Sequence, residues 1–325
     1  MNRPKTPLVI QKRTFQRRLE QIAARSGLRP PFGWRFFERS PLMKAEHVTF
    51  LMQKGNHGAA CMMTGVFGEE GFFSTPAADD KAAADGLLDT LLARHRLWAT
   101  RVIAGPVSPH LFDTDGGLTV SGFDADVSCF STDEAPFWDG LLQKHGFKVA
   151  GCASLYSLDE ARFPAERYSR AAQESMRRYG YHVVSARSLG LGTACTTMAH
   201  LAQREPLLGM DGHAFYESLH ALGNAWSPET TAIAIRDGEA IGYILTLVDR
   251  KKHILRAATA QVASNWQRRG VTAALADLTV RSGRGFHIEA GVIDDDNFAS
   301  RWCVENAGGR VVRQMRRYKY EITVS

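Results

Sequence analysis

A short segment in the last third of the chain holds the residues whose types and spacing best fit a chemical role. It reads Gln267-Arg268-Arg269-Gly270-Val271-Thr272-Ala273 and stands where a predicted strand ends and a predicted helix begins. A helix N-terminus presents backbone N–H groups that lack intrahelical acceptors, together with a partial positive charge, and both attract phosphate groups. Gly270 lets the backbone approach such a ligand closely, and the two arginines add positive charge. The segment therefore predicts a binding site for a pyrophosphate.

The elements around this segment have the order that such a site needs. Hydrophobic periodicity predicts a strand before it, a helix that starts at Gly270, and a second strand after that helix. Asn297 then provides an N-cap for another helix, which Gly308 and Gly309 end. The strands expected in this half are 231–235, 240–248, 254–262, 286–293 and 310–322, the helices are 166–179, 213–222, 270–282 and 298–307, and Gly190 and Gly192 mark a turn region.

The same segment resembles the signature of the GNAT acetyltransferase superfamily, which is Gln/Arg-x-x-Gly-x-Gly/Ala after a strand with a valine five residues before the glutamine. The matching positions are Val262, Gln267, Gly270 and Thr272, of which Thr272 departs from the pattern by its β-branched side chain. The resemblance implies acetyl-CoA or another acyl-CoA as co-substrate. The backbone N–H groups from Arg268 to Ala273 would then hold its pyrophosphate, and the backbone near Val262 would pair with its pantetheine arm.

A second part of the resemblance concerns the helix after Asn297. Family members often have an asparagine there, which implies that Asn297 contacts the cofactor arm as well as capping the helix. The family helix usually carries a tyrosine that protonates the departing thiolate, but the aligned position here is Val304. Tyr216, Tyr318 and Tyr320 remain open as substitutes.

The resemblance also implies a mechanism, in which an amine attacks the thioester directly in a ternary complex. A backbone N–H near Val262 would polarise the carbonyl, and a base would take the ammonium proton. Glu289 and His253 are the candidate catalytic residues, with Glu229 as a further alternative. The scattered histidines and the five cysteines lack metal-ligand spacing, so we expect no metal site.

The first half carries its own pattern. Predicted strands at 48–53, 59–67, 101–107 and 147–158 alternate with helices at 79–98 and 133–145. The stretches 41–47, 71–73, 105–107 and 117–124, with 305–310 near the end, resemble bacterial tandem-GNAT proteins over residues 41–325. This implies an α/β (α+β) chain of two GNAT-like domains, each a mixed, mostly antiparallel sheet flanked by helices.

The two implied domains are expected to differ in function. The loop of the first half that corresponds to the signature, residues 74–81, is acidic and lacks the glycine motif. Because carboxylates repel a pyrophosphate, we expect residues 41–165 to be a degenerate domain that does not bind CoA and residues 166–325 to be the acyl-CoA-binding domain.

Charge sets the first 40 residues apart. They hold ten Lys or Arg and two Glu, whereas the net charge of the whole 325-residue chain is +6, so the rest sums to −2. Such a basic arm could contact nucleic acid, although a solvated extension is the simpler interpretation. The absence of a long apolar run, a secretory signal or paired cysteines predicts a cytoplasmic protein with no membrane partner.

Three functions remain open from the sequence. The first is an N-acyltransferase acting on a small amine. The second is a CoA-binding or sensing protein that has lost catalysis, which Val304 favours. The third is a transferase that the basic arm guides to a nucleic acid or a protein.

Overall fold

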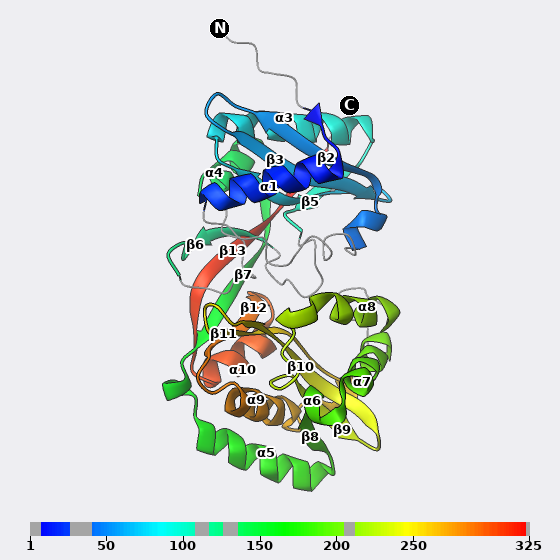
Figure 1. Ribbon diagram of the computed structural model, residues 1–325, viewed down its shortest axis with the longest axis vertical. Helices are drawn as coiled ribbons and strands as arrows, with labels where there is room; N and C mark the ends of the chain where they lie inside the picture. Colours follow the sequence, from blue (N-terminus) through cyan, green and yellow to red (C-terminus); the bar gives the residue numbers. More distant parts are fainter. Residues whose placement is uncertain (1–7, 27–40, 108–116, 126–135, 205–211, 323–325) are drawn as a thin grey trace. The chain divides into compact units, whose positions relative to one another are not determined.

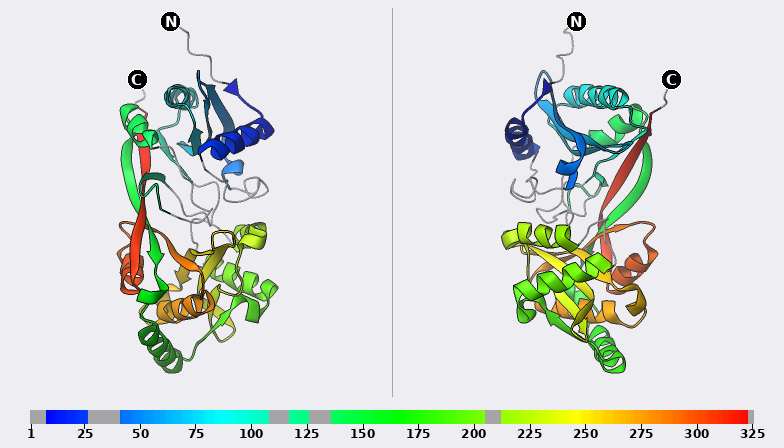
Figure 2. Two further views of the ribbon diagram at one scale, coloured as in Figure 1. Left: turned by 60° about the vertical axis from the view of Figure 1, so that its left-hand side comes forward. Right: turned by 90° about the vertical axis from the view of Figure 1, so that its right-hand side faces the viewer.

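The structure, a computed structural model, describes residues 8–26, 41–107, 117–125, 136–204 and 212–322, which form two compact units (Figures 1 and 2). Unit 1 comprises Met1–Ser154 and Arg313–Ser325, and unit 2 comprises Leu155–Val312. Strand β7 (Lys148–Leu158) begins in unit 1 and ends in unit 2, whereas β13 (Gly309–Glu321) begins in unit 2 and ends in unit 1. The last strand therefore contributes to the first unit, where we had expected one boundary near residue 165.

Unit 1 contains a mixed sheet in the order β1-β2-β3-β4-β5-β13. Neighbouring strands are antiparallel except β4 and β5, which are parallel and are joined through helix α3. The elements are β1 (Leu8–Val9), α1 (Lys12–Ser26), β2 (Glu46–Lys54), β3 (Ala59–Phe67), β4 (Glu70–Ala78), α3 (Lys81–Leu97), β5 (Val102–Gly105), β6 (Leu118–Ser121), which pairs with β13, and α4 (Phe137–Lys144).

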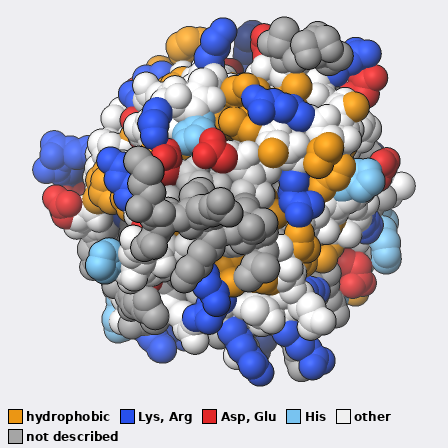
Figure 3. Space-filling view, turned by 90° about the horizontal axis from the view of Figure 1, so that it is seen from above, with side chains coloured by type: hydrophobic (Ala, Val, Ile, Leu, Met, Phe, Trp, Pro, Cys, Tyr) orange, Lys and Arg blue, Asp and Glu red, His pale blue; other side chains and the backbone are white. Residues whose placement is uncertain are grey.

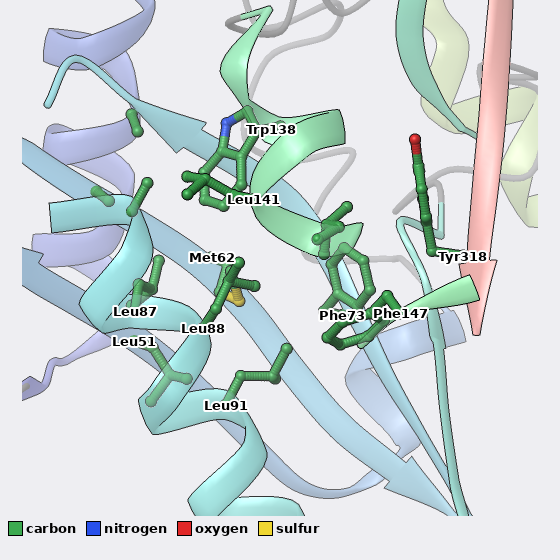
Figure 4. Close-up of a cluster of buried hydrophobic side chains, with 14 of the residues drawn as sticks. Leu51, Met62, Phe73, Leu87, Leu88, Leu91, Trp138, Leu141, Phe147 and Tyr318 are labelled. Atoms are coloured by element: carbon green, nitrogen blue, oxygen red, sulfur yellow. The ribbon is translucent and has the colours of Figure 1, made fainter. Parts of the chain in front are cut away.

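Side-chain alternation along β2 and β3 gives unit 1 two cores, one on each face of its sheet. Leu51 and Met62 point to the face covered by α3 and α4, where they pack with the leucines of α3 and with Trp138 (Figure 4). The adjacent residues Phe50 and Met63 point to the opposite face. The buried residues of that second core are Phe15, Phe50, Met52, Cys61, Met63, Phe72 and Ala77.

The second core includes part of the segment that we expected to be a solvated arm. Phe15 on α1 is fully buried, and its ring centroid lies 4.8 Å from that of Phe50. Leu8 pairs with Met52 across β1 and β2, so residues 8–26 belong to unit 1 because an apolar face of α1 covers its sheet. On the face shown in Figure 3, the described Lys and Arg side chains lie in several separate groups among apolar ones.

A buried histidine links α3 to the sheet of unit 1 and makes its stability depend on pH. The Thr64 hydroxyl donates to the Phe72 carbonyl, which leaves its oxygen to accept from His95 Nε2 at 2.8 Å. Burial lowers the pKa of His95 to about 4 from its ordinary 6.5. The unfolded chain therefore takes up the proton first as the pH falls. We expect His95 to cost up to about 3 kcal/mol of unfolding free energy between pH 6.5 and pH 4.

Urea unfolding of the wild type and a His95→Gln variant at pH 7 and at pH 4.5 tests this prediction. The free-energy advantage of the wild type should shrink at the lower pH, because glutamine takes up no proton. An advantage that stays constant across the two pH values would contradict a neutral buried histidine.

Unit 2 repeats the order of elements in unit 1 and adds helices before it. Its sheet runs β8-β9-β10-β11-β12 and then to the last residues of β7, and again β11 and β12 are parallel strands joined through a helix, α9. The elements are α5 (Ala165–Tyr179), β8 (His182–Ser185), α6 (Ala186–Leu189), α7 (Leu191–Arg204), α8 (Gly212–Leu222), β9 (Ala232–Arg236), β10 (Glu239–Asp249), β11 (Ile254–Val262), α9 (Val271–Ser282), β12 (His287–Asp294) and α10 (Phe298–Asn306).

Helices cover both faces of the sheet in unit 2. A Cβ at Gly242 of β10 would lie 3.1 Å from Val271 of α9, so that residue faces α9. The next residue, Tyr243, faces the other way, and its ring centroid lies 5.7 Å from that of Phe215 on α8. None of the helices among the described residues combines the length and apolar character needed to cross a membrane.

Several elements differ from the sequence-based expectation. Residues 74–78, expected to be a loop, continue β4, and Gly192 lies in helix α7 rather than in a turn. The short strands β6 and β8 had no counterpart among the predicted elements. Helix α4 begins at Phe137, and the expected helical residues 133–135 and the break at 30–33 lie outside the described residues.

Candidate functional site

The segment singled out in the sequence forms the turn between β11 and α9. A short 3₁₀ helix, Ser264–Trp266, follows β11, and α9 begins directly after Gly270. Arg268 and Gly270 both have left-handed backbone conformations, with φ of 60° and 74°. The first-turn amides of α9 point out of the helix without intrahelical acceptors. Gln267, Arg268 and Thr272 are exposed, Val262, Arg269, Gly270 and Ala273 are half-buried, and Val271 is buried.

Glycine at position 270 is required by a neighbouring helix as well as by its φ angle. A Cβ there would lie 2.0 Å from Ser175 Oγ on α5. Figures 1 and 2 show α5 running alongside α9. The contact continues at Ser169, whose Oγ donates to Asp277 Oδ1 at 2.6 Å. Helix α5 therefore supports the back of the turn, while Gln267, Arg268 and Thr272 remain open to solvent.

The strands on either side of α9 pair over a short distance and then part. The parallel register of β11 and β12 covers residues 254–256 against 287–289, although β11 continues to Val262 and β12 to Asp294. Gly291, with a φ of 94°, lies just past the last pair, and a Cβ there would be 2.6 Å from the Ala257 carbonyl oxygen. Beyond this point the β11 edge is released from the β12 ladder and can pair with an extended, amide-bearing ligand.

A β-bulge lies in the same part of β11. The β10–β11 register passes from Leu245 and Thr259 directly to Thr246 and Ala257, and therefore skips Ala258. A bulge takes backbone groups out of the regular ladder and often occurs next to a functional site. The sequence around this buried alanine is a run of small residues and contains no signal for a bulge.

The structure gives Glu289 a structural environment. Its Oε2 lies 3.7 Å from Arg256 Nε, and each side chain is 1% exposed. The two residues form the last register pair before β11 and β12 part. An ion pair buried in this way holds the strands together and leaves the carboxylate with a partner other than a substrate proton.

The structure does not bring His253 to the turn. It is an exposed residue with a φ of 55° in the turn before β11, close to Phe286. The nine residues of β11 separate it from Val262, which corresponds to roughly 27 Å of extended chain. His253 therefore lies at the opposite end of β11 from the predicted pyrophosphate site.

Helix α10 follows β12, and Asn297 caps it. The Asn297 Oδ1 accepts from the Ser300 N–H at 3.1 Å. Val304 is half-buried and packs against the close turn at Gly309. Tyr156 on β7, which no sequence pattern had indicated, donates its hydroxyl to Glu305 Oε1 at 3.1 Å. Desolvation, with Glu305 adding to it, raises the pKa of Tyr156 above its ordinary value.

An aromatic residue next to the turn also had no place in the sequence-based prediction. Trp266 is almost fully buried, and the guanidinium carbons of Arg269 and Arg236 lie 4.8 and 5.0 Å from its ring centroid. Arg269 also lies 5.8 Å from the ring of Tyr179. These side chains come from β9, the end of α5 and the turn itself, so their proximity could not be deduced from sequence spacing.

The corresponding turn of unit 1, between β4 and α3, is occupied by carboxylates. Asp80 caps α3 by accepting from the Ala83 N–H, and Asp79 accepts from the Ala59 N–H at 2.6 Å. The hydrogen bond from Ala83, with a smaller contribution from His57, holds the pKa of Asp80 below its usual range. The N-terminus of α3 thus already carries an internal anion where a phosphate would bind.

The strands of unit 1 also differ beyond their common register. Residues 70–72 of β4 pair with 102–104 of β5 in the same three-residue parallel pattern that unit 2 shows. However, β5 ends at Gly105, and the Val107 N–H then donates to the Phe73 carbonyl at 2.9 Å. This hydrogen bond occupies the β4 backbone just where the strands of unit 2 part.

Comparison with known proteins gives matches in structure alone. No family model and no curated protein matches the sequence. A tandem GNAT protein from the clavulanic acid biosynthesis pathway matches with a TM-score of 0.61 at 11% identity over 98% of both chains. A GCN5-related N-acetyltransferase from Sphaerobacter thermophilus matches with a TM-score of 0.56 at 12% identity, over 100% of this chain and 98% of that one.

A longer protein also contains a similar region. The chain matches a GCN5-related glucosamine N-acetyltransferase region of a fungal multi-domain GH3 β-N-acetylglucosaminidase with a TM-score of 0.61 at 13% identity. The match covers 98% of this chain and 38% of the fungal one. With two units that repeat one order of strands and helices, and with these matches along its length, the chain has the GNAT fold.

Proposed function

We propose that unit 2 binds an acyl-CoA, with acetyl-CoA as the first candidate, and transfers its acyl group to the amine of a small acceptor. The observation that carries this proposal is the turn at residues 267–273. It presents the exposed N-terminus of α9 beside the point where β11 and β12 part. One feature suits a pyrophosphate and the other suits the extended pantetheine arm.

Binding would use backbone groups more than side chains. The N–H groups from Arg268 to Ala273 would hold the pyrophosphate, with Gly270 allowing its close approach. The edge of β11 from Ala257 to Val262 would pair with the amides of the pantetheine arm. Asn297, at the start of α10, would border the same arm from the β12 side.

The transfer itself needs few groups from the protein. The amine nitrogen bonds to the thioester carbonyl carbon, the carbon–sulfur bond breaks, and the thiolate and the ammonium exchange a proton through solvent or a side chain. A backbone N–H released at the Ala258 bulge would polarise the carbonyl. Glu289 and His253 are not assigned as bases in this proposal, because the first is buried against Arg256 and the second is remote from the turn.

Unit 1 would have no CoA site of its own. Asp79 and Asp80 place negative charge at the N-terminus of α3, and Val107 occupies the β4 edge. Both features oppose the two interactions that unit 2 offers to the cofactor.

A second candidate function is CoA binding without catalysis. The observation in its favour is Val304, which supplies no proton to a departing thiolate at the position where the resembling family usually has tyrosine.

Acyl transfer from acetyl-CoA to a panel of amino acids, polyamines and amino sugars distinguishes the two candidates. We expect release of the free CoA thiol together with an acetylated product for a subset of amines, both measured by mass spectrometry, and neither with a Gly270→Asp variant. Tight binding of acetyl-CoA with no acylated amine across the panel would favour the second candidate.

A further inference from the structure

Two arginines share one indole ring next to the turn. The guanidinium carbons of Arg236 and Arg269 lie 5.0 and 4.8 Å from the Trp266 centroid. Arg269 directly precedes Gly270, the N-cap of α9, so its charge lies beside the helix N-terminus. Arg236 belongs to β9, and its charge is brought to the turn by the fold.

The surroundings of both arginines hold them in place. Arg236 Nη1 donates to the Tyr179 carbonyl oxygen at 3.0 Å, and Arg269 lies 5.8 Å from the Tyr179 ring. The Trp266 ring is itself held by an edge contact with Tyr181, at a centroid distance of 6.1 Å. Aromatic faces attract cations and orient the planar guanidinium group.

The charge in this cluster is not balanced internally. Among the described residues, the carboxylate paired with these two guanidinium groups is that of Asp237, which lies 3.2 Å from Arg236 Nε and is largely exposed. Arg177 and Arg178 end the adjacent helix α5, and Arg268 is exposed in the turn. Like charges held this close repel one another, and an anion of two charges would relieve that repulsion.

We propose that Arg236 and Arg269, positioned by Trp266, bind the 3′-phosphate of CoA. This inference rests on the proposed function and extends it to the choice of donor. The N-terminus of α9 provides for the pyrophosphate, so the arginine pair is left for the second phosphate group of the same molecule. A phosphate monoester carries close to two negative charges at neutral pH and accepts forked hydrogen bonds from guanidinium groups.

The consequence is selection for free, 3′-phosphorylated CoA thioesters. Acyl groups carried on 3′-dephospho-CoA, or on phosphopantetheine attached to a carrier protein, lack this phosphate and are poor donors. Trp266 is a positioning residue, because it contacts the arginines and not the phosphate.

Calorimetric titration with acetyl-CoA and with acetyl-3′-dephospho-CoA tests the proposal. The wild type is expected to bind acetyl-CoA about 30-fold more tightly, the effect of one strong charge-assisted contact. Arg236→Gln and Arg269→Gln should each reduce this ratio to a few-fold while changing the affinity for the dephospho compound little. Arg284→Gln, at the far end of α9, is the matched control and should keep the wild-type ratio.

Two further variants separate the positioning role from folding. Trp266→Phe keeps an aromatic face and should retain most of the ratio, whereas Trp266→Leu should lose it. Equal binding of both compounds by the wild type, or an equal loss of both in the arginine variants, would overturn the 3′-phosphate site and leave the proposed function standing. Binding of neither compound by folded wild-type protein would overturn both.

Discussion

Replacing Gly270 with alanine is expected to weaken the binding of acetyl-CoA by at least about 100-fold, or about 2.7 kcal/mol. The new Cβ would lie 2.0 Å from Ser175 Oγ, and the φ of 74° is unfavourable for a side chain. Either the turn or α5 has to move, and in both cases the amides of the first turn of α9 lose the arrangement that a pyrophosphate needs. Isothermal titration calorimetry measures the loss directly.

Two controls separate this effect from a general loss of stability. Gly285 has a φ of 86°, and a Cβ added there would have no described heavy atom within 4 Å, so Gly285→Ala carries the backbone cost without the clash. It should bind acetyl-CoA like the wild type. Adding Ser175→Gly to Gly270→Ala removes the clash and should restore part of the affinity. Wild-type affinity in Gly270→Ala itself would contradict the assigned site.

The second large effect is expected at the buried ion pair of unit 2. Glu289→Ala leaves the Arg256 guanidinium, which is 1% exposed, without its carboxylate. Breaking a buried pair in this way typically costs about 3–5 kcal/mol of unfolding free energy. The loss should appear as a lower urea midpoint at neutral pH. Replacing both residues together, as Arg256→Met with Glu289→Leu, should recover most of the stability because no buried charge remains.

An exposed ion pair provides the matched comparison. Arg204 and Glu239 also pair in unit 2 but are largely exposed, so Glu239→Gln should cost at most about 1 kcal/mol. The result also bears on catalysis. If Glu289→Gln kept the wild-type unfolding midpoint and lost acyl transfer, Glu289 would be a general base and its structural role would be refuted.

The strands and helices around the turn could be predicted because local patterns determine them. Alternating apolar residues, a glycine at the start of α9 and an asparagine at the start of α10 marked β11, α9, β12 and α10 to within a residue or so. The resemblance in the same residues led to the GNAT fold, which the solved structures confirm.

Features formed by distant segments could not be predicted in the same way. The pairing of Glu289 with Arg256 depends on the register of β12 against β11, and the contact of Ser175 with Gly270 depends on how α5 packs. Strand β13 pairs with β5, more than 200 positions earlier in the chain, which no local pattern indicates. The prediction for residues 74–78 was wrong because serine, threonine and proline suggested a loop, although pairing with β3 makes them a strand.

One acyl-CoA is expected to bind at the turn before α9, and none at the corresponding turn of unit 1. A crystal structure of the whole chain with acetyl-CoA added would decide this. It should show the pyrophosphate against the backbone N–H groups of residues 268–273, with the pantetheine arm along β11. A cofactor bound instead at Asp79 and Asp80 before α3, or in both units, would contradict the proposed division of roles between the two units.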